Sequence, residues 1–494
     1  MFNSVVEAVF HHAERFPDRF CLADDASGVT WGGYAQKISR LAAAFSSLGI
    51  APGGRVVVEA CQTVGYLAAE LALQRIGAVF VPLEHNCAAD KMADVARRVE
   101  ASALIACNPP KGAAALCLSY GDLDRLSAQD RSFEAGPWPD ASAVSEILFS
   151  TGTTGKEKGI ILTHAADIAL AENVIHGVEM EPDNVEMIPS PMNHSHGLRR
   201  YYANMVNGSA VVLLGSAMDM RRFFSNMDAY RVNSLDLVPA ALTLVLKLSR
   251  GGLAAYRDRL RYIQFGAAPM RDEDRREICR LLPDTRLYNF YGSTESGCVA
   301  IYNFNRPDAK PNCIGRPACN AEIFFTDEDR KRIVPSAQRP GLLACSGPMN
   351  MLGYWQDPQE TAAALSCGAV YSSDEAYPDA DGDIILLGRR GDVINVGGSK
   401  VAPQEIEDAA RAFSGVADCG AIPVPDPYKG MAPKLFVQVR PGCDVDFAAL
   451  RAFLAERLEG YKLPVSIERI DAIPRSFNGK LLRNVLKERE RRGQ

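Results

Sequence analysis

Long apolar runs are missing from this chain of 494 residues. No stretch approaches the ~20 consecutive apolar residues of a membrane-spanning helix, so we expect no membrane span. The first residues, MFNSVVEAVFHHAERF, lack a basic leader and carry Glu7 and Glu14. This composition argues against a secretory signal and favours an amphipathic helix.

Paired cysteines are missing too. The thirteen cysteines are an odd number, are scattered, and form no C-x-x-C pair. This argues against a disulfide framework and against a structural zinc site, and predicts free thiols in a reducing cytoplasm. A net charge of −6 gives no sign of a general nucleic-acid or membrane-surface binder. Internal repeats and low-complexity linkers are also absent.

What is present is a regular alternation of helix-like and strand-like segments. Residues 33–116 alternate in this way, and the same rhythm returns over 207–291. This predicts an α/β fold with largely parallel sheets covered by helices. After residue 310 short strands and turns dominate, and a compact α/β unit begins near residue 403. The length suggests about three units.

The segment ILFSTGTTGKEKGIILTH, residues 147–164, concentrates hydroxyl groups and glycines between two strand-like runs. It fails the Walker pattern, because Glu157 stands where that pattern needs glycine. It also fails the dinucleotide G-x-G-x-x-G pattern, because its glycines fall at 152, 155 and 159. Glycine-rich backbone and hydroxyls can hold an anion, which favours a phosphate loop over a solvated surface loop.

Three further motifs follow in order: YNFYGSTES (288–296), GRRGDVINVGGSKVAPQEIE (388–407) and IPRSFNGKLLR (473–483). With the loop and the segment at 29–56, they resemble the adenylate-forming superfamily of acyl- and aryl-CoA synthetases, luciferases and peptide-synthetase adenylation domains. The resemblance implies ATP-driven conversion of a carboxylic acid to an acyl-adenylate and pyrophosphate. It also implies a large N-terminal domain, 1–389, of two βα-layered subdomains and a small β-rich one. A small mobile C-terminal α/β lid, 390–494, completes the fold.

The resemblance assigns an ATP site. The hydroxyl-rich loop would close over the β- and γ-phosphates with Thr151, Gly152, Thr153, Thr154, Gly155 and Lys158. Adenine would meet Asn289, Tyr291 and Gly292, and Gly266, Ala267 and Ala268 would line adenine and the acyl group. Thr294 would touch the α-phosphate, and Asp374 and Arg389 would hold the ribose. Mg²⁺ would bind Glu295 with Thr154, since hard cations prefer oxygen ligands. Glu157 replaces the usual proline of this loop, and we expect it to point to solvent near Lys156 and Lys158.

The catalytic residues implied are Lys480, Thr294, Glu295 and His194. Lys480 would swing in on the lid and bind the acid's carboxylate and the α-phosphate. The lid would pivot at Gly391. Gly397, Gly398 and Lys400 match the CoA-binding segment of the CoA-ligase branch, which favours CoA as thiol acceptor. An acyl carrier protein as acceptor, and an inactive nucleotide-binding protein, stay open as alternatives. The oligomeric state, a homodimer included, also stays open.

The acid itself is less well defined by the sequence. His194 matches the family's histidine near the acyl carboxylate, and His194–His196 as a metal pair is not favoured. An arginine that malonyl-CoA synthetases use is Leu244 here, so malonate is not supported. Arg199 and Arg200 are expected at a solvated helix start. An apolar lining is expected from Leu237, Val238, Ala240 and Leu244.

Overall fold

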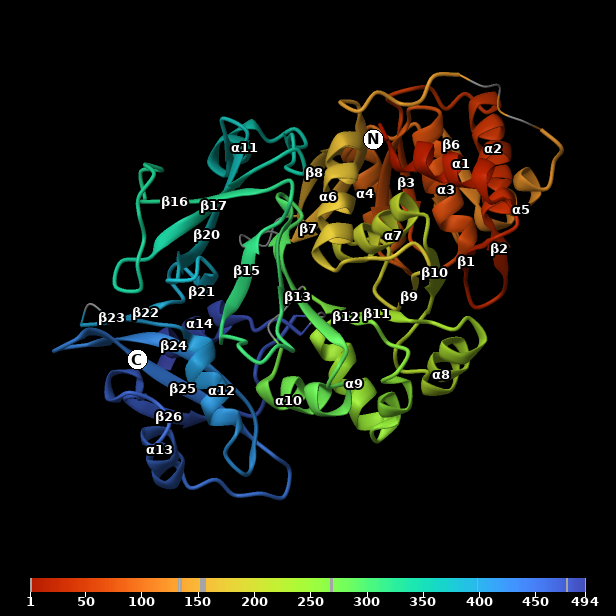
Figure 1. Cartoon of the computed structure of the whole chain (residues 1–494). Coiled ribbons are helices and arrows are strands. Elements are labelled where there is room, and N and C mark those ends of the chain that lie inside the picture. The colour runs from red at the N-terminus through yellow and green to blue at the C-terminus, as the bar shows by residue number, and fades with distance from the viewer. Residues whose placement is uncertain are drawn as a thin grey trace.

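The computed structural model describes residues 2–131, 133, 136–151, 157–266, 270–397, 399–476 and 479–493 (Figure 1). Three β-sheets organise this part of the chain. Two of them, with their helices, build a large N-terminal domain, and the third forms the core of a smaller C-terminal domain. The predicted α/β class and this division into a large and a small domain are confirmed.

The first sheet has the strand order β18-β8-β7-β4-β3-β5-β6, and β4, β3, β5 and β6 run parallel. Its central strands are runs such as RVVVE and VFVPL, apolar on both faces as a doubly covered parallel sheet requires. The strands are β3 (Arg55–Glu59), β4 (Val79–Leu83), β5 (Ala103–Ala106), β6 (Leu116–Ser119), β7 (Val144–Thr151), β8 (Glu157–Thr163) and β18 (Gly353–Tyr354).

The second sheet has the order β16-β17-β20-β21-β15-β14-β13-β12-β11-β9-β10-β1-β2, with β19 on β20. Its parallel part is β1 (Phe20–Ala23), β9 (Val185–Ile188), β10 (Ala210–Leu213), β11 (Ser234–Leu237), β12 (Tyr262–Phe265) and β13 (Arg286–Ser293), with β2 (Gly28–Thr30) antiparallel at the edge. The antiparallel arm is β14 (Gly297–Asn303), β15 (Cys313–Pro317), β16 (Glu322–Thr326), β17 (Gly341–Ser346), β19 (Leu365–Ser366), β20 (Ala369–Pro378) and β21 (Ile384–Arg389). This arm is the β-rich region expected after residue 310.

Helices separate and cover the two sheets. One apolar core joins the first sheet to the second through the helices α1 (Val5–Arg15), α2 (Trp31–Ser47), α3 (Val64–Arg75), α6 (His164–Gly177) and α7 (Ser195–Asn207). Outside the first sheet packs α4 (Ala89–Arg98), and α5 (Tyr120–Ser127) follows β6. Outside the second lie α8 (Met220–Ala229), α9 (Pro239–Ser249), the 3₁₀ turn η1 (Gly252–Tyr256) and α10 (Asp272–Leu281), and α11 (Pro358–Ala364) precedes β19.

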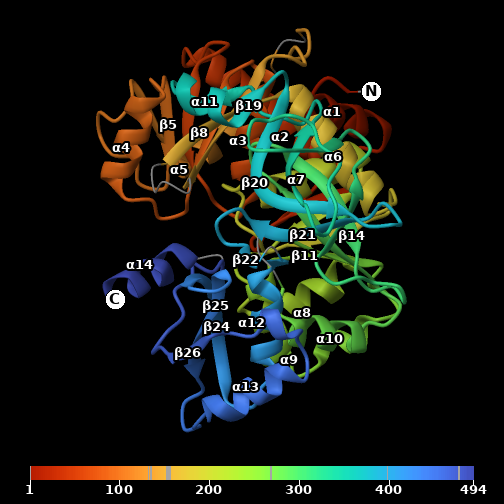
Figure 2. The ribbon, with the colours of Figure 1, turned by 90° about the vertical axis from the view of Figure 1, so that its left-hand side faces the viewer.

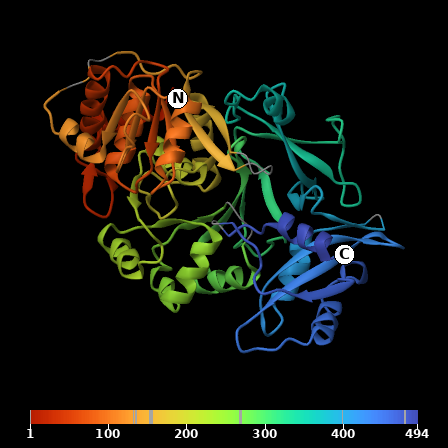
Figure 3. The ribbon, with the colours of Figure 1, turned by 180° about the vertical axis from the view of Figure 1, so that it is seen from behind.

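The C-terminal domain has its own core and a sheet of order β23-β22-β25-β24, with β26 on β25. Its elements are β22 (Ile394–Val396), β23 (Ser399–Val401), α12 (Pro403–Arg411), β24 (Val416–Asp426), β25 (Gly430–Val439), α13 (Phe447–Ala455), η2 (Gly460–Lys462), β26 (Ser466–Arg469) and α14 (Arg483–Gly493). It lies below the β20–β21 arm and beside α9 and α10 (Figures 1, 2 and 3). Among the described helices, none is long and apolar enough to cross a membrane.

Candidate active site

The sequence motifs converge where the two sheets and the C-terminal domain meet. Thr151 closes β7 and Lys158 lies in β8, and these two antiparallel strands flank the hydroxyl-rich segment in the chain. Gly152, Thr153, Thr154, Gly155, Ala267, Ala268 and Gly398 lie outside the described residues. Asn289, Tyr291 and Gly292 lie on β13, and Gly266 directly follows the neighbouring β12.

Tyr291 joins two predicted ribose contacts. Its hydroxyl donates to Asp374 Oδ2 at 2.6 Å, and Arg389 Nε lies 3.8 Å from the other oxygen, Oδ1, of the same carboxylate. Asp374 and Arg389 face each other across β20 and β21. Burial, and then the Asp374 charge, raise the pKa of Tyr291 well above its usual value, so this phenol stays a donor at neutral pH.

Lys480 reaches the same cluster from the C-terminal domain. The pKa of Lys480 is lowered, first by loss of hydration and then by the Arg389 guanidinium, whereas Asp374 and Asp392 act in the opposite direction. The charges of both predicted ribose contacts thus act on the Lys480 ammonium. A β-carbon on Gly479, the preceding residue, would lie 3.5 Å from Ala240 Cβ at the start of α9. The C-terminal domain is therefore closed onto the N-terminal domain.

A chain of contacts links Lys158 to the predicted metal ligand. The Lys158 ammonium pairs with Glu360 and lies 4.9 Å from the ring centre of Tyr354. The Tyr354 hydroxyl in turn donates to Glu295 Oε1 at 2.9 Å. No Lys or Arg in the described part of the chain pairs with the Glu295 carboxylate. Its charge thus fits a divalent cation between protein and phosphates. Thr294 lies beside it, half-buried.

Glu157 departs from expectation. Its carboxylate pairs with Lys91 of α4 at 2.8 Å, and Lys91 also holds Glu84 at 2.8 Å. Glu157 is half-buried, so the expectation that it points to solvent beside Lys156 and Lys158 is wrong. Sequence reasoning missed Lys91 because α4 lies 66 positions before Glu157. The pair neutralises the negative charge that Glu157 adds to β8.

The predicted histidine stands directly before helix α7. His194 is the N-cap residue of α7, where the chain passes from an extended segment into the helix. The preceding segment is held by Gln62, whose amide nitrogen donates to the Ser190 carbonyl at 3.1 Å and whose amide oxygen accepts from Met192 N at 3.2 Å. His194 is exposed at this position, as a group that meets the substrate's carboxylate must be.

Arg199 and Arg200 are buried, not solvated. Arg200 makes a bidentate pair with Glu186 of β9, both contacts at 2.8 Å, and both side chains are fully enclosed. Arg199 donates to the carbonyls of Ser195 at 3.0 Å and Ser293 at 3.2 Å. The expectation of a solvated helix start is wrong because α7 lies between the two sheets. Glu186, the partner of Arg200, could not be recognised from local sequence.

Near helix α7 and strands β11 and β12, some described polar atoms are buried without hydrogen-bond partners. Gln264 of β12 is fully buried, and neither its amide nitrogen nor its amide oxygen has a hydrogen-bond partner among the described residues. The same holds for Arg200 Nη1. Asp236, the β11 neighbour of Gln264, lies 2.9 Å from His196 Nε2 and accepts from the Ser190 hydroxyl at 2.5 Å.

One of these groups, His196, lies against Gly266. A β-carbon at position 266 would lie 2.8 Å from His196 Cε1 and 3.4 Å from Phe290 Cβ, so a side chain there would displace the His196 ring. The Arg200 guanidinium lies 5.6 Å from the centre of the Phe290 ring. We call Arg200, Asp236, His196 and Gln264 the polar floor. The apolar lining expected from Leu237, Val238, Ala240 and Leu244 stays a prediction: Leu237 is buried, Val238 and Leu244 are half-buried, and Ala240 is exposed.

The predicted hinge and CoA segment lie between the domains. Gly391 has φ +84, a left-handed conformation that glycine adopts without steric penalty, and a β-carbon at this position would meet no atom within 4 Å. Its carbonyl accepts from Lys487 Nζ at 2.8 Å. Gly397 is exposed. Lys400 pairs with buried Glu375 of β20 at 3.2 Å, so in this arrangement it joins the two domains.

Comparisons with known proteins agree with this geometry. The family model described as AMP-binding enzyme matches residues 9–355, and its C-terminal domain model matches 405–480. The 4-coumarate–CoA ligase-like 9 of Oryza sativa subsp. japonica is 28% identical over 98% of this chain and 92% of its own length. A feruloyl-CoA synthase of Amycolatopsis is 28% identical over 97% of both chains.

Among solved structures, ATP-bound MatB from Rhodopseudomonas palustris superposes with a TM-score of 0.86 at 24% identity, over 99% of both chains. This likeness concerns the fold. The family model covers more than half of the chain, and the resemblance stated from the motifs is confirmed. The chain belongs to the AMP-binding enzyme family of adenylate-forming enzymes, in its CoA-ligase branch.

Proposed function

We propose that this AMP-forming acid–CoA ligase performs both half-reactions with the residues gathered around Asp374 and Lys480. The observation that carries the proposal is the cluster of Tyr291, Asp374 and Arg389, with Lys480 in electrostatic range from the C-terminal domain. In this cluster the residues assigned to the nucleotide would act together with one positive charge from the C-terminal domain, as a reaction between two anions requires.

In the first half-reaction a carboxylate oxygen of the acid attacks the α-phosphorus of ATP. The bond to the bridging oxygen breaks, and pyrophosphate leaves. Lys480 stabilises the charge gathered on the carboxylate and the α-phosphate, while Asp374 and Arg389 hold the ribose. Thr294 contacts the α-phosphate, and His194 orients the acid. Lys158 remains at the base of the loop that covers the β- and γ-phosphates. Mg²⁺, held by Glu295 and Thr154, would neutralise phosphate charge when bound.

In the second half-reaction the CoA sulfur attacks the acyl carbonyl carbon. The thiol proton passes to solvent, the carbon–oxygen bond to AMP breaks, and the thioester forms. We propose that the domain of residues 390–494 acts as a lid that turns at Gly391 between the two steps. Gly397, Gly398 and Lys400 then line the path of the thiol. The glycine conformation at 391 supports this, because rotation needs a residue free in φ.

We further propose that the acid carries a hydroxyl group far from its carboxylate. The polar floor offers donors from Arg200 Nη1 and Gln264 and an acceptor from Gln264. A hydroxyl both donates and accepts, so it satisfies this set. A second carboxylate would only accept, and it would face the buried Glu186 and Asp236 carboxylates. Thirteen cysteines without a disulfide in the described chain support a reducing compartment such as the cytoplasm.

The test of activity is pyrophosphate release from Mg-ATP across a panel of carboxylic acids, with and without CoA. We expect sustained turnover only when CoA is present, with the acyl-CoA product seen by mass. A single burst that CoA does not prolong would instead indicate a carrier-protein acceptor. ATP binding without pyrophosphate release for any acid would indicate an inactive binding protein.

The test of acid class compares pairs of acids that differ only by the distal hydroxyl, in wild type and in Gln264→Leu. We expect wild type to prefer the hydroxylated member, and the substitution to reduce that kcat/KM ratio by about tenfold or more, because a buried amide left unpaired disfavours the deoxy acid. Equal ratios in the two proteins would contradict the role of the polar floor, while leaving the ligase activity established by the first test.

A further inference from the structure

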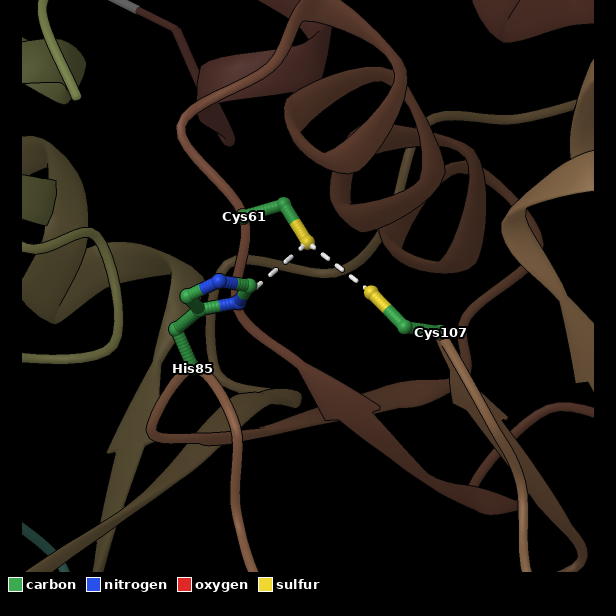
Figure 4. A group of neighbouring side chains, drawn as sticks. All are labelled: Cys61, His85 and Cys107. Atoms are coloured by element: carbon green, nitrogen blue, oxygen red, sulfur yellow. Dashed lines mark hydrogen bonds between the residues drawn. The ribbon is translucent and has the colours of Figure 1, made fainter.

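Away from the residues assigned above, two cysteines and a histidine meet at one edge of the first sheet. Cys61 follows β3 by two residues, His85 follows β4 by two, and Cys107 follows β5 directly. These three strands are parallel neighbours in the order β4-β3-β5, so their carboxyl ends lie at the same edge. Figure 4 shows the three side chains directed toward one another.

The distances suit a tetrahedral metal ion. Cys61 Sγ lies 3.8 Å from Cys107 Sγ and 4.0 Å from His85 Nδ1, and all three atoms lie within 4.8 Å of one another. Two sulfurs bound to one zinc ion at about 2.3 Å each stand about 3.8 Å apart at the tetrahedral angle. The sulfur–sulfur distance thus already has the value that a shared ion would impose.

The surrounding residues hold these groups in place. Glu59, at the end of β3, is 3% exposed, and its two carboxylate oxygens accept from Asn86 N at 2.8 Å and Cys107 N at 2.7 Å. One carboxylate therefore fixes the turns that carry His85 and Cys107. Glu59 Oε1 also lies 3.7 Å from His85 Nδ1, the same nitrogen that faces Cys61. Glu59 would therefore support a metal site through the two turns that it holds, and not by bonding the other ring nitrogen.

We propose that Cys61, His85 and Cys107 bind a zinc-type cation, with the fourth position open to water. Thiolate and imidazole are the ligands that Zn²⁺ prefers, and the set of two sulfurs and one nitrogen selects it over Mg²⁺ or Ca²⁺. On binding, two thiol protons pass to solvent and two zinc–sulfur bonds form. His85 and Cys107 are exposed, which gives the ion a path of entry. The site does not depend on the proposed acid or acceptor.

This proposal runs against the expectation, drawn from the sequence, that the chain has no structural zinc site. That expectation rested on the absence of closely spaced cysteine pairs. Here the ligands are 24 and 46 positions from Cys61 and come together only through the strand order. The ion would also be connected, through neighbouring side chains, to residues described in the candidate active site. Glu84 precedes His85 and is joined through Lys91 to Glu157 at the end of the phosphate loop, and Gln62 follows Cys61.

The experiment is a titration of the full-length, reduced, metal-free protein with Zn²⁺ alone against a chromophoric chelator. We expect one zinc ion per chain to be retained in competition. Co²⁺ in place of Zn²⁺ should give the intense sulfur-to-metal charge-transfer absorption of thiolate ligands. Zn²⁺ should also protect Cys61 and Cys107 from iodoacetamide, as mapped by peptide mass. These three readouts require no substitution and no catalytic activity.

Variants assign the ion to these residues. Cys107→Ser and His85→Gln change exposed side chains, and we expect each to weaken zinc binding by at least about 100-fold. Cys443→Ser, an exposed cysteine of the C-terminal domain, is the matched control and should bind as wild type does. Stoichiometry and affinity unchanged in Cys107→Ser would overturn the proposal. So would a Cys61–Cys107 disulfide that forms in air while the reduced protein fails to retain zinc.

Discussion

In the proposed mechanism Lys480 is the cation that the C-terminal domain brings to the phosphates, and its effect should be confined to the adenylation step. Replacement by Ala removes a positive charge from the place where negative charge gathers, and we expect about 10²–10³-fold slower adenylate formation. The measurement is acid-dependent exchange of labelled pyrophosphate into ATP. Lys331→Ala, an exposed lysine at the β16–β17 turn, is the control and should exchange at the wild-type rate.

Thioester formation from supplied acyl-adenylate should survive in Lys480→Ala. A variant that lost both half-reactions equally would show that Lys480 supports the fold or the closed arrangement, and not the chemistry of the first step alone.

His164 predicts a pH dependence of stability in the acid range. It is 1% exposed at the start of α6, its Nδ1 atom has no hydrogen-bond partner among the described residues, and burial lowers its pKa to about 4. In the unfolded chain the pKa of this histidine is about 6.5. Between these two pKa values the histidine therefore binds a proton in the unfolded chain but not in the folded chain. This stabilising contribution is complete above pH 6.5 and is lost as the pH falls from there toward 4.

The measurement is the melting temperature at about pH 7.5 and at about pH 5. At about pH 5 the low pKa of His164 lowers the free energy of unfolding by about 2 kcal/mol. His164→Leu should show a smaller decrease than wild type. His176→Leu, an exposed histidine in the last turn of the same helix, should retain the full decrease. Parallel curves for wild type and His164→Leu would contradict the assignment.

At the same scale, the structure shows which residues a sequence can reveal. Tyr291, Asp374 and Arg389 are predicted through the resemblance to a known family, and the structure brings them together. That Asp374 and Arg389 hold ribose, and that Tyr291 meets the adenine ring, stays a prediction. The burial of Arg200 was missed because its partner Glu186 is 14 positions away on another element. A charged residue is expected at the surface unless the partner that balances its charge is known, and local sequence does not identify that partner.

At the scale of elements, strand β23 and strand β20 are joined by Lys400 and Glu375. The resemblance assigns Lys400 to CoA, whereas this arrangement uses it to hold the domains closed. Both are accommodated if Lys400 changes partner when the lid turns. We expect Lys400→Ala to slow adenylate formation several-fold, because it leaves the buried Glu375 carboxylate unpaired in the closed arrangement.

The measurement separates the two steps by rapid quench: adenylate formed from acid and ATP, then thioester formed from supplied adenylate at varied CoA. Loss only in the second step, as a higher KM for CoA, would assign Lys400 to CoA alone. The exposed Lys429, whose backbone carbonyl contacts Gly397, offers the control Lys429→Ala.

The elements themselves were largely predictable. The βα rhythm of 33–116 appears as α2, β3, α3, β4, α4, β5 and β6, because helical and strand periodicities are local properties. The order in which strands pair is not local. The sequence runs β3, β4, β5, but the sheet runs β4-β3-β5, and only this order brings Cys61, His85 and Cys107 together. The same limit applies to the polar floor, where Asp236 and Gln264 meet through neighbouring strands.

At the scale of the whole molecule, the described parts of the two domains meet through the Lys400–Glu375 ion pair and a close approach of Gly479 to Ala240. The large apolar cores lie within each domain, not between them. Domains joined in this way are expected to move relative to one another. A rotation of the lid would break the Lys400–Glu375 pair and separate Gly479 from Ala240, and neither change disturbs a core.

This predicts that a covalent link can hold the enzyme in one half-reaction. The β-carbons at positions 240 and 479 would lie 3.5 Å apart, within the range of about 3.5–4.5 Å that a disulfide spans. The double variant Ala240→Cys with Gly479→Cys should, once oxidised, form one equivalent of acyl-adenylate and pyrophosphate and then stop, since the lid cannot turn to admit CoA. Dithiothreitol should restore thioester formation.

Two controls are needed. Position 479 has φ +81, so a side chain there costs about 1–2 kcal/mol of local strain, and the reduced double variant shows the effect of this strain without the crosslink. Each single variant, oxidised in the same way, controls for the thirteen native cysteines. If the crosslinked enzyme, verified by mass, still turns over with CoA at the reduced rate, then both half-reactions proceed in the closed arrangement and Gly391 is not a hinge.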